Sequence, residues 1–500
     1  MNGREKSDSS VVPEKPPNKS DAAAPGAEAA EGRGLAKRNR IEGDIRRTQR
    51  RDNDMPNALD RIREAARRDG RQRFTSLMHH VYDVDRLRAA YKAIRKDAAA
   101  GVDGVTWQKY GDHLEENLQN LAGRLARGGY RAKPVRRTHI PKADGGQRPL
   151  GVPTLEDKIV QRSALEVLGS IYETDFLGFS YGFRPGRRQH DALDALTVAI
   201  SKRNVRWVLD ADIRGLFDTL DHEWLIKFVE HRIGDQRVIR LIRKWLNAGA
   251  LEDGKRVRTQ VGAAQGGSIS PLLANIYLHY VLDLWIQQWR TKRARGDVVV
   301  VRYADDFVVG FTHQADGVRF LNELRERVAK FGLELHPDKT RLIEFGRSAD
   351  DDRRGRGQGK PATFDFLGFT HYCGKTRRGT FVVKRKTSKS RFQTKLKQVR
   401  KHLRRHLDWS VPRMGAYLGA VVRGHANYYG VPFNYQAIAR FRRAIGRMWK
   451  WVLERRSQRT TIRWDRMARL IERWLPRARI CHPYPEQRFG VITRGRSRMR

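Results

Sequence analysis

Residues 298–311, VVVVRYADDFVVGF, place two adjacent carboxylates between two apolar runs. Each run has the length and the β-branched and aromatic composition of a buried strand, and residues 303–306 would form the tight connection between them. Asp305 and Asp306 are then predicted to lie at the tip of a β-hairpin. Because aspartate side chains often accept backbone hydrogen bonds in turns, a purely structural role for the pair stays open at this point.

A second acidic segment makes that structural role less attractive. Residues 207–218, WVLDADIRGLFD, form a short β-like run that ends in Asp210 and Asp212, which share one face by strand alternation. Three carboxylates that converge on one point repel one another unless divalent cations neutralise them, and hard oxygen ligands suit Mg²⁺. Two such ions, about 4 Å apart, can activate an attacking hydroxyl and stabilise a leaving oxygen. The pattern therefore indicates nucleotidyl transfer.

The chain as a whole carries a large positive charge. Its 500 residues include 101 Lys and Arg against 56 Asp and Glu, which gives a formal net charge of +45 and favours nucleic acid as the partner. An anionic membrane surface is the alternative. The sequence has no apolar run of about 18 residues and no signal-peptide core, so we expect no membrane partner and a cytoplasmic location. The two cysteines, Cys373 and Cys481, are too far apart in sequence to predict a disulfide framework or a CxxC zinc site.

Composition separates an N-terminal arm from the folded part. Residues 1–70 are rich in Ala, Gly, Pro, Ser and charge and are predicted to form a disordered basic arm. Apolar residues recur at a helical period over residues 74–96, where folded structure is expected to begin. Residues 139–150, HIPKADGGQRPL, predict a hairpin with Lys142 and Arg148 beside its tip. Between residues 156 and 320, helical patterns alternate with β-rich runs, as in a mixed α/β domain.

The composition changes again after about residue 380. Residues 384–407 hold eleven Lys or Arg and no acid, and are predicted to form a basic helix. One apolar stripe at helical spacing leaves the cations on a solvated face, and the lack of balancing acids favours contact with nucleic acid over an ordinary charged surface. The stripe consists of Phe392, Leu396, Val399, Leu403 and Leu407. Four tryptophans that follow are expected to lie in a core rather than to stack on bases. They are Trp449, Trp451, Trp464 and Trp474.

The segment YADD at 303–306 resembles the Tyr-x-Asp-Asp box of reverse transcriptases, and the surrounding blocks resemble the group II intron-encoded reverse transcriptase/maturase family. The matching blocks occur in the family's order over residues 75–490. They are GVDGVTW (101–107), RPLGVPTLEDKIVQ (148–161), YGFRPGR (181–187), QGGSISPLLANIYL (265–278), HPDKT (336–340) and FLGF (366–369). The resemblance implies an α/β right-hand polymerase of fingers and palm, followed by an all-α basic thumb or maturase domain.

The resemblance also implies a domain order. Fingers and palm would occupy residues 71–375, the thumb or maturase domain 380–465, including GHANYYG at 424–430, and a basic DNA-binding tail 466–500. Many members of the family continue into a His-Asn-His endonuclease, and this sequence stops before such a segment. We therefore expect the primer to come from a nascent strand at a replication fork.

Single residues match catalytic positions of the family. Asp212, Asp305 and Asp306 match the acids that bind two Mg²⁺ ions, and Asp212 is preferred to Asp210 because Phe217 follows it by five residues. Phe217 matches the aromatic ring that stands under the nucleotide sugar and excludes a 2′-hydroxyl. Ordinary core packing is the alternative for that ring.

Other residues match positions around the incoming deoxynucleoside triphosphate. Lys142 and Arg148 match the fingers residues that hold the triphosphate. The compact ammonium charge of lysine and the planar guanidinium of arginine both suit that role. Gln265 begins the glycine-rich block that lines the nucleotide, and Lys339 matches a palm residue near the active site. The block departs from the family pattern at Ala263 and Ala264, where Thr or Ser and then Pro are common.

The basic segment supplies the expected RNA-binding residues. These are Lys384, Arg385, Lys386, Lys389, Arg391, Lys395, Lys397, Arg400, Lys401 and Arg404. The resemblance implies that the protein binds its parent intron RNA, promotes splicing, and copies that RNA into DNA at a target DNA site. Two alternatives stay open: a maturase with an inactive polymerase that acts only in splicing, and a reverse transcriptase recruited to defence or diversification.

Overall fold

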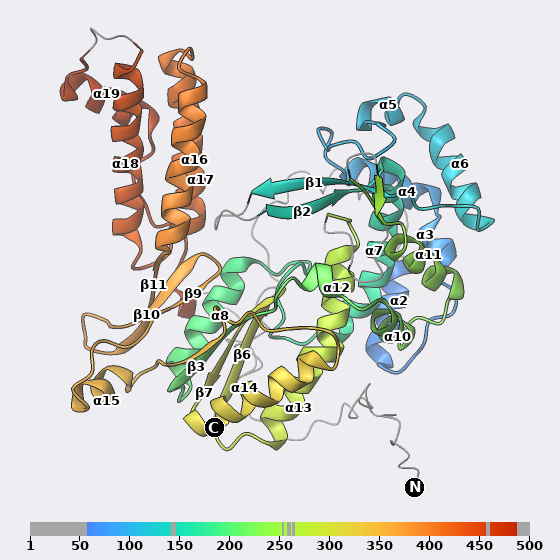
Figure 1. Ribbon diagram of the computed structural model, residues 1–500, viewed down its shortest axis with the longest axis horizontal. Coiled ribbons are helices and arrows are strands. Elements are labelled where there is room, and N and C mark those ends of the chain that lie inside the picture. The colour runs from blue at the N-terminus through green and yellow to red at the C-terminus, as the bar shows by residue number, and fades with distance from the viewer. Residues whose placement is uncertain are drawn as a thin grey trace.

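The protein folds into a mixed α/β body with a bundle of long helices at one end (Figure 1). The computed structural model describes residues 58–141, 147–252, 255–257, 262, 266–456 and 461–487. Within these ranges the strands form two four-stranded sheets and one three-stranded sheet. This architecture agrees with the right-hand polymerase class implied by the sequence.

The N-terminal lobe surrounds a sheet of order β2-β1-β4-β5. Strands β1 and β2 are antiparallel with Ile140 opposite Arg148, which confirms the hairpin predicted over residues 139–150. Its turn, with Lys142, lies outside the described residues. The elements are α2 (Ala58–Arg68), α3 (Met78–Val81), α4 (Val84–Ala93), α5 (Trp107–Gly111), α6 (Leu114–Ala126), β1 (Val135–Pro141), β2 (Gln147–Val152), α7 (Leu155–Asp175), β4 (Ala250–Glu252) and β5 (Lys255–Val257).

The central sheet has the order β6-β7-β3-β8 and carries both acidic segments. Strands β6 (Val298–Tyr303) and β7 (Asp306–Phe311) are buried along nearly their whole length, which confirms the two buried strands predicted on either side of the aspartate pair. Strand β3 (Trp207–Asp212) lies beside β7, and β8 (Arg341–Glu344) beside β3. The neighbouring helices are α8 (Gln189–Lys202), α9 (Leu216–Thr219), α10 (His222–Glu230), α11 (Gln236–Leu246), α12 (Ser270–Leu278), the π-helix η1 (His279–Asp283), α13 (Leu284–Lys292) and α14 (Gln314–Ala329).

A small sheet joins the central body to the helical bundle. The buried guanidinium of Arg385 on β11 contacts Asp194 on α8 at 2.9 Å, which ties this sheet to the body. The bundle has its own apolar core, in which Leu403, Phe441 and Trp449 are fully buried. The elements are α15 (Ala349–Gly355), β9 (Phe364–Phe366), β10 (Phe369–Lys375), β11 (Phe381–Thr387), α16 (Lys389–Arg405), α17 (Val411–Tyr429), α18 (Tyr435–Glu454) and α19 (Trp464–Trp474).

Three boundaries differ from the sequence prediction. Residues 58–68, assigned to the disordered arm, form α2, because Leu59 and Ala66 pack into the main core. The basic segment is not one helix: residues 384–387 end strand β11, and α16 begins at Lys389. Leu407 lies beyond the end of α16 and is 37% exposed, so it does not extend the buried stripe.

The C-terminal boundary predicted at residue 465 falls inside α19. Met467 and Leu475 are buried in the same core as α17 and α18, so the bundle extends at least to Leu475. The prediction that the tryptophans lie in a core holds for Trp449 and not for Trp464. Trp449 is fully buried, whereas Trp464 is 54% exposed.

A buried ion pair lies directly behind the hairpin formed by β6 and β7. Arg302 donates from Nε to Asp283 Oδ1 at 2.7 Å and from Nη2 to Oδ2 at 2.5 Å, and both side chains are completely buried. Asp283 closes the π-helical turn η1, a feature that is rare and often lies at functional sites. The Asp283 carboxylate at the end of this turn thus reaches Arg302 on β6.

We predict that Asp283→Asn lowers the free energy of unfolding by about 3 kcal/mol, because it leaves the buried Arg302 guanidinium without its counter-charge. Chemical denaturation would measure the change. The matched control is Arg354→Ala, which removes the exposed pair between Arg354 and Asp350 on α15 and is expected to cost about 0.5 kcal/mol or less. Equal losses in the two variants would contradict the structural role of the buried pair.

Candidate active site

The aspartate pair lies at a two-residue hairpin turn. Tyr303 pairs with Asp306 across β6 and β7, and Ala304 and Asp305 form the turn between them. Ala304 has φ of 59°, a left-handed conformation that the turns joining adjacent antiparallel strands require. The prediction of a tight connection at residues 303–306 is therefore confirmed.

The strand register brings the third carboxylate to the same place. Asp212 at the end of β3 lies opposite Asp306 at the start of β7, and the Ile213 amide donates to the Asp305 carbonyl at 3.2 Å. The structure thus brings together Asp212, Asp305 and Asp306, the three residues that the sequence selected. Asp210 lies on the same strand two residues earlier and is also buried.

Electrostatic repulsion at this edge of the sheet is substantial. Burial raises the pKa of Asp306 well above its usual value, and the charges of Asp210, Asp212 and Asp305 raise it further. Burial raises the pKa of Asp210 to about 7, although Arg341 opposes the shift with a guanidinium 3.8 Å away. At this edge of the sheet the ionised carboxylates are therefore disfavoured, and a cation that offset their repulsion would favour them.

A lysine partly offsets that charge. Lys339 Nζ lies 2.6 Å from Asp212 Oδ2, and the lysine side chain is 60% exposed. Among the described residues, no three ligand-type side chains are placed closely enough to hold a metal ion. The donor set nevertheless suits Mg²⁺, because its members are carboxylates and a cation already contacts one of them. Lys339 is located beside the acids, where the resemblance implied.

Several groups hold the turn from behind. Arg302 Nη1 donates to the Ala304 carbonyl at 3.0 Å and to Asn275 Oδ1 at 3.1 Å. The Asn275 amide in turn donates to the Gly182 carbonyl at 2.8 Å. A Cβ at position 182 would overlap the backbone of Ala304, so only glycine fits there. The sequence analysis missed Arg302, Asn275 and Asp283; the one signal for Arg302 is a charged residue inside an otherwise apolar strand.

The expected nucleotide pocket is only partly described. Lys142, Gln265, Ala263 and Ala264 lie outside the described residues, as does the Arg148 side chain, although its backbone belongs to β2. A Cβ at Gly266 would overlap the Gly151 carbonyl, so the glycine-rich block approaches β2 closely.

The block is anchored on both sides. Gln161 on α7 accepts a hydrogen bond from the Ser268 amide at 2.8 Å. The Gly262 amide donates to the Leu220 carbonyl at 2.7 Å. Phe217 is half-buried and packs on the main core, so one part of its ring contributes to packing and another part is accessible.

The basic segment offers most of its cations to solvent. The exposed members are Lys386, Lys389, Arg391, Lys395, Lys397, Arg400, Lys401 and Arg404, and Lys384 is half-exposed. Arg385 corrects the prediction: its guanidinium is buried against Asp194 and is not available to RNA. Arg400, Arg404 and Arg455 all lie within 5.2 Å of the Trp451 ring centre, so cation–π contacts gather three guanidinium groups on one surface.

The two remaining candidates, Tyr428 of the GHANYYG block and Cys373, lie in environments that indicate packing rather than chemistry. Tyr428 donates to the Leu367 carbonyl at 2.8 Å and stacks on Phe369, which agrees with packing. Burial raises the pKa of the Cys373 thiol to about 11, as expected of an unreactive thiol. Over the part of the chain that the structure describes, none of the helices has the length and apolar character needed to span a bilayer.

Comparison with known proteins identifies the family. Residues 140–371 match the family model described as reverse transcriptase (RNA-dependent DNA polymerase). Protein YkfC of Escherichia coli K12 is 38% identical over 274 residues, which are 48% of this chain and 71% of YkfC. The group II intron-encoded protein LtrA of Lactococcus lactis subsp. cremoris is 37% identical over 235 residues, 47% of this chain and 39% of LtrA.

A yeast relative matches a larger share of the chain. The putative COX1/OXI3 intron 2 protein of Saccharomyces cerevisiae is 32% identical over 307 residues, which are 60% of this chain and 32% of that protein. The chain thus spans less than half the length of LtrA and of the yeast protein. Together with the aspartate hairpin, these matches show that the chain belongs to the group II intron-encoded reverse transcriptase/maturase family.

Proposed function

We propose that the protein is an RNA-directed DNA polymerase that also binds its parent intron RNA and promotes splicing and mobility. The observation that carries the proposal is the meeting of Asp212, Asp305 and Asp306 at the open end of the central sheet. At the same end, burial and neighbouring carboxylates raise the pKa of Asp306, so a divalent cation would relieve the repulsion of the ionised forms. Intron RNA, target DNA and deoxynucleoside triphosphates are the proposed partners, and the cytoplasm is the proposed location.

In this proposal, Asp212, Asp305 and Asp306 hold two Mg²⁺ ions. When bound, these ions would activate the primer 3′-hydroxyl and offset charge on the leaving pyrophosphate. The protein's own groups position the reactants. The turn fixed by Arg302 presents the aspartates, and the half-buried Phe217 is proposed to stand under the nucleotide sugar, where its ring would exclude a 2′-hydroxyl.

Cations complete the proposed nucleotide site. Lys339 neutralises Asp212 in the free protein, and its exposed side chain can turn to the phosphates once another cation occupies the carboxylates. Lys142, Arg148 and Gln265 are proposed to hold the triphosphate and the base from the fingers side. In the primer-extension step, the 3′-oxygen attacks the α-phosphate, a new phosphodiester bond forms, and pyrophosphate leaves.

The helical bundle is proposed as the thumb or maturase domain. Its exposed cations on α16 and the guanidinium cluster around Trp451 suit contact with phosphates. The exposed cations of α16 belong to the helical bundle, whereas the aspartate hairpin belongs to the central sheet (Figure 1), so RNA binding and polymerisation should be separable by mutation.

We predict that Asp305→Asn combined with Asp306→Asn lowers primer extension on an RNA template roughly 100- to 1,000-fold or more, because the variant removes the charge that holds the cations. Intron RNA binding should stay within about twofold. The matched control is Asp351→Asn with Asp352→Asn, an adjacent and exposed pair on α15. Wild-type protein that binds intron RNA but extends no primer would instead favour a maturase that acts only in splicing.

Phe217→Ala is expected to raise the ratio of ribonucleotide to deoxyribonucleotide incorporation by about tenfold or more, because removal of the ring opens space for a 2′-hydroxyl. Single-nucleotide incorporation with each substrate would measure the ratio. Phe217→Tyr keeps the ring and should keep the wild-type ratio. An unchanged ratio in Phe217→Ala, with stable folding, would assign the ring to core packing alone.

Salt dependence tests the proposed RNA surface. The triple variant Lys397→Gln, Lys401→Gln and Arg404→Gln should weaken intron RNA binding and reduce the slope of log K against log salt by about one for each lost phosphate contact. The control is a triple variant that removes three exposed cations elsewhere: Lys292→Gln on α13, Arg325→Gln on α14 and Lys330→Gln at the C-terminal end of α14. Equal slopes for the two triples would show that net charge, rather than this surface, controls binding.

A further inference from the structure

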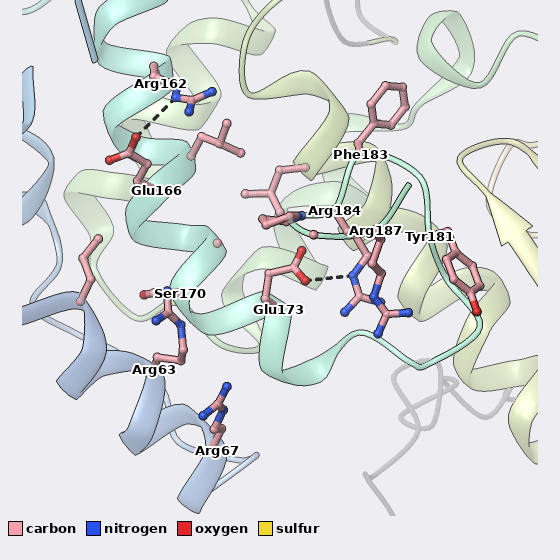
Figure 2. Close-up of a pocket in the computed structure, with 16 residues that line it drawn as sticks. Arg63, Arg67, Arg162, Glu166, Ser170, Glu173, Tyr181, Phe183, Arg184 and Arg187 are labelled. Carbon is pink, nitrogen blue, oxygen red and sulfur yellow. Dashed lines mark hydrogen bonds and ion pairs between the residues drawn. The ribbon is translucent and has the colours of Figure 1, made fainter. Parts of the chain in front are cut away.

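A large groove lies beside the aspartate hairpin and is used by none of the roles described above. It has a volume of about 990 Å³ and lies between α2, α7 and the loop at residues 181–187 (Figure 2). Helix α7 contributes the floor through residues spaced three or four apart, from Arg162 to Glu173. At 1.5 Å per residue this floor is about 16 Å long, enough for a few nucleotides of a single strand.

The groove carries a positive charge. Five arginines line it against two glutamates. Arg63 and Arg67 reach it from α2 on one side, and Arg162 lies beside Glu166 at the N-terminal end of the part of α7 that lines the groove (Figure 2). The excess of guanidinium groups favours a polyanion, and guanidinium groups bind phosphates through two parallel hydrogen bonds.

An exposed aromatic ring stands at the edge of this charged groove. Phe183 is 53% exposed and has φ of 59°, a conformation that costs free energy for any residue other than glycine. Figure 2 shows its ring directed away from the loop. A phenyl ring gains nothing from exposure to water, so the surroundings must impose this position.

The neighbours of Phe183 fix the loop. Gly182 packs against the backbone of Ala304 at the hairpin turn. On the other side, the buried Arg184 donates to Glu173 at 2.9 Å and to the Leu177 and Ser180 carbonyls at 2.8 Å each. The ring is therefore held between the catalytic turn and the charged groove.

The groove also lies on a defined side of the catalytic turn. Helices α2 and α7 lie on the side of the central sheet opposite the helical bundle (Figure 1). A product duplex that leaves toward the cations of the bundle therefore leaves the uncopied template on the side of α2 and α7. This placement of the uncopied template rests on the function proposed above.

We propose that the groove binds the unpaired template RNA ahead of the primer terminus, and that Phe183 stacks on one of its bases while Arg63, Arg67 and Arg162 contact its phosphates. Stacking on an aromatic ring tolerates every base, as copying of any template requires. In this role Phe183 is a positioning residue, because it contacts the template away from the reacting atoms.

The test compares template–primers whose template extends one or six nucleotides beyond the primer terminus. Binding is measured by fluorescence polarisation without deoxynucleotides. Wild type should bind the six-nucleotide overhang more tightly, and Phe183→Ala should reduce this gain about fivefold or more. Phe433→Ala is the matched control, because Phe433 is also exposed, at 40%, and also has a positive φ, of 69°, but does not line the groove.

The cations are tested in the same way. Arg63→Gln with Arg67→Gln should reduce the gain from the overhang, whereas Arg61→Gln with Arg68→Gln, on the same helix but outside the groove, should not. A 2-aminopurine base two nucleotides ahead of the primer should be quenched in wild type and brighter in Phe183→Ala.

Extension of the one-nucleotide template in wild type reports separately on the proposed polymerase. If that extension occurs but the gain from the overhang is absent in wild type, or is equal in wild type and Phe183→Ala, the inference about the groove is wrong and the proposed function stands. If the variants instead lose binding to free intron RNA with an unchanged gain, the groove contacts the intron rather than the template.

Discussion

The buried pair of Arg302 and Asp283 is the constraint on which the active site depends. A charged guanidinium in the middle of an apolar strand is costly to bury unless every donor finds a partner. Here the partners are Asp283, Asn275, Ser180 and the carbonyl of Ala304. These groups come from the π-helical turn, from α12 and from the segment before the groove loop. The pair therefore links two distant parts of the chain, the continuous stretch of α12 and η1 and the segment at Ser180, to the catalytic turn.

At the turn itself, neighbouring carboxylates repel one another, in contrast to the oppositely charged pair of Arg302 and Asp283. The acids at the end of β3 and the start of β7 are half-buried beside one another, and the pKa of Asp306 is raised by burial and by its acidic neighbours. A fold selected only for stability would relieve this repulsion by substitution, because unpaired buried charge is strongly destabilising. Arg302 supplies the stability behind the turn, and the turn presents its carboxylates where a cation can reach them from solvent. Lys339 already contacts Asp212 there.

The strands were predictable from the sequence because local residue patterns determine them. The groups that hold the turn, such as Arg302 and its partners, could not be predicted because they depend on packing between distant segments. The apolar runs around Asp305 and Asp306 and the alternation at Asp210 and Asp212 determine three strands and their acidic ends, which the structure confirms. Nothing near Arg302 in the sequence reveals a partner on a π-helix. Likewise, charge composition could not separate Arg385, which lies in a buried pair, from the exposed cations on α16. Burial depends on contacts between distant segments.

Ala304 shows why this support matters. Glycine or asparagine would adopt its left-handed φ at lower cost, yet alanine occupies the turn. Glycine at this position would also leave the carboxylates on a more flexible backbone. With alanine, the conformation persists only because Arg302 holds the Ala304 carbonyl and Gly182 packs against its amide. The same contact places Phe183, itself left-handed, at the edge of the groove. One junction thus fixes both the acids and the exposed ring, so a shift in the loop would move the two together.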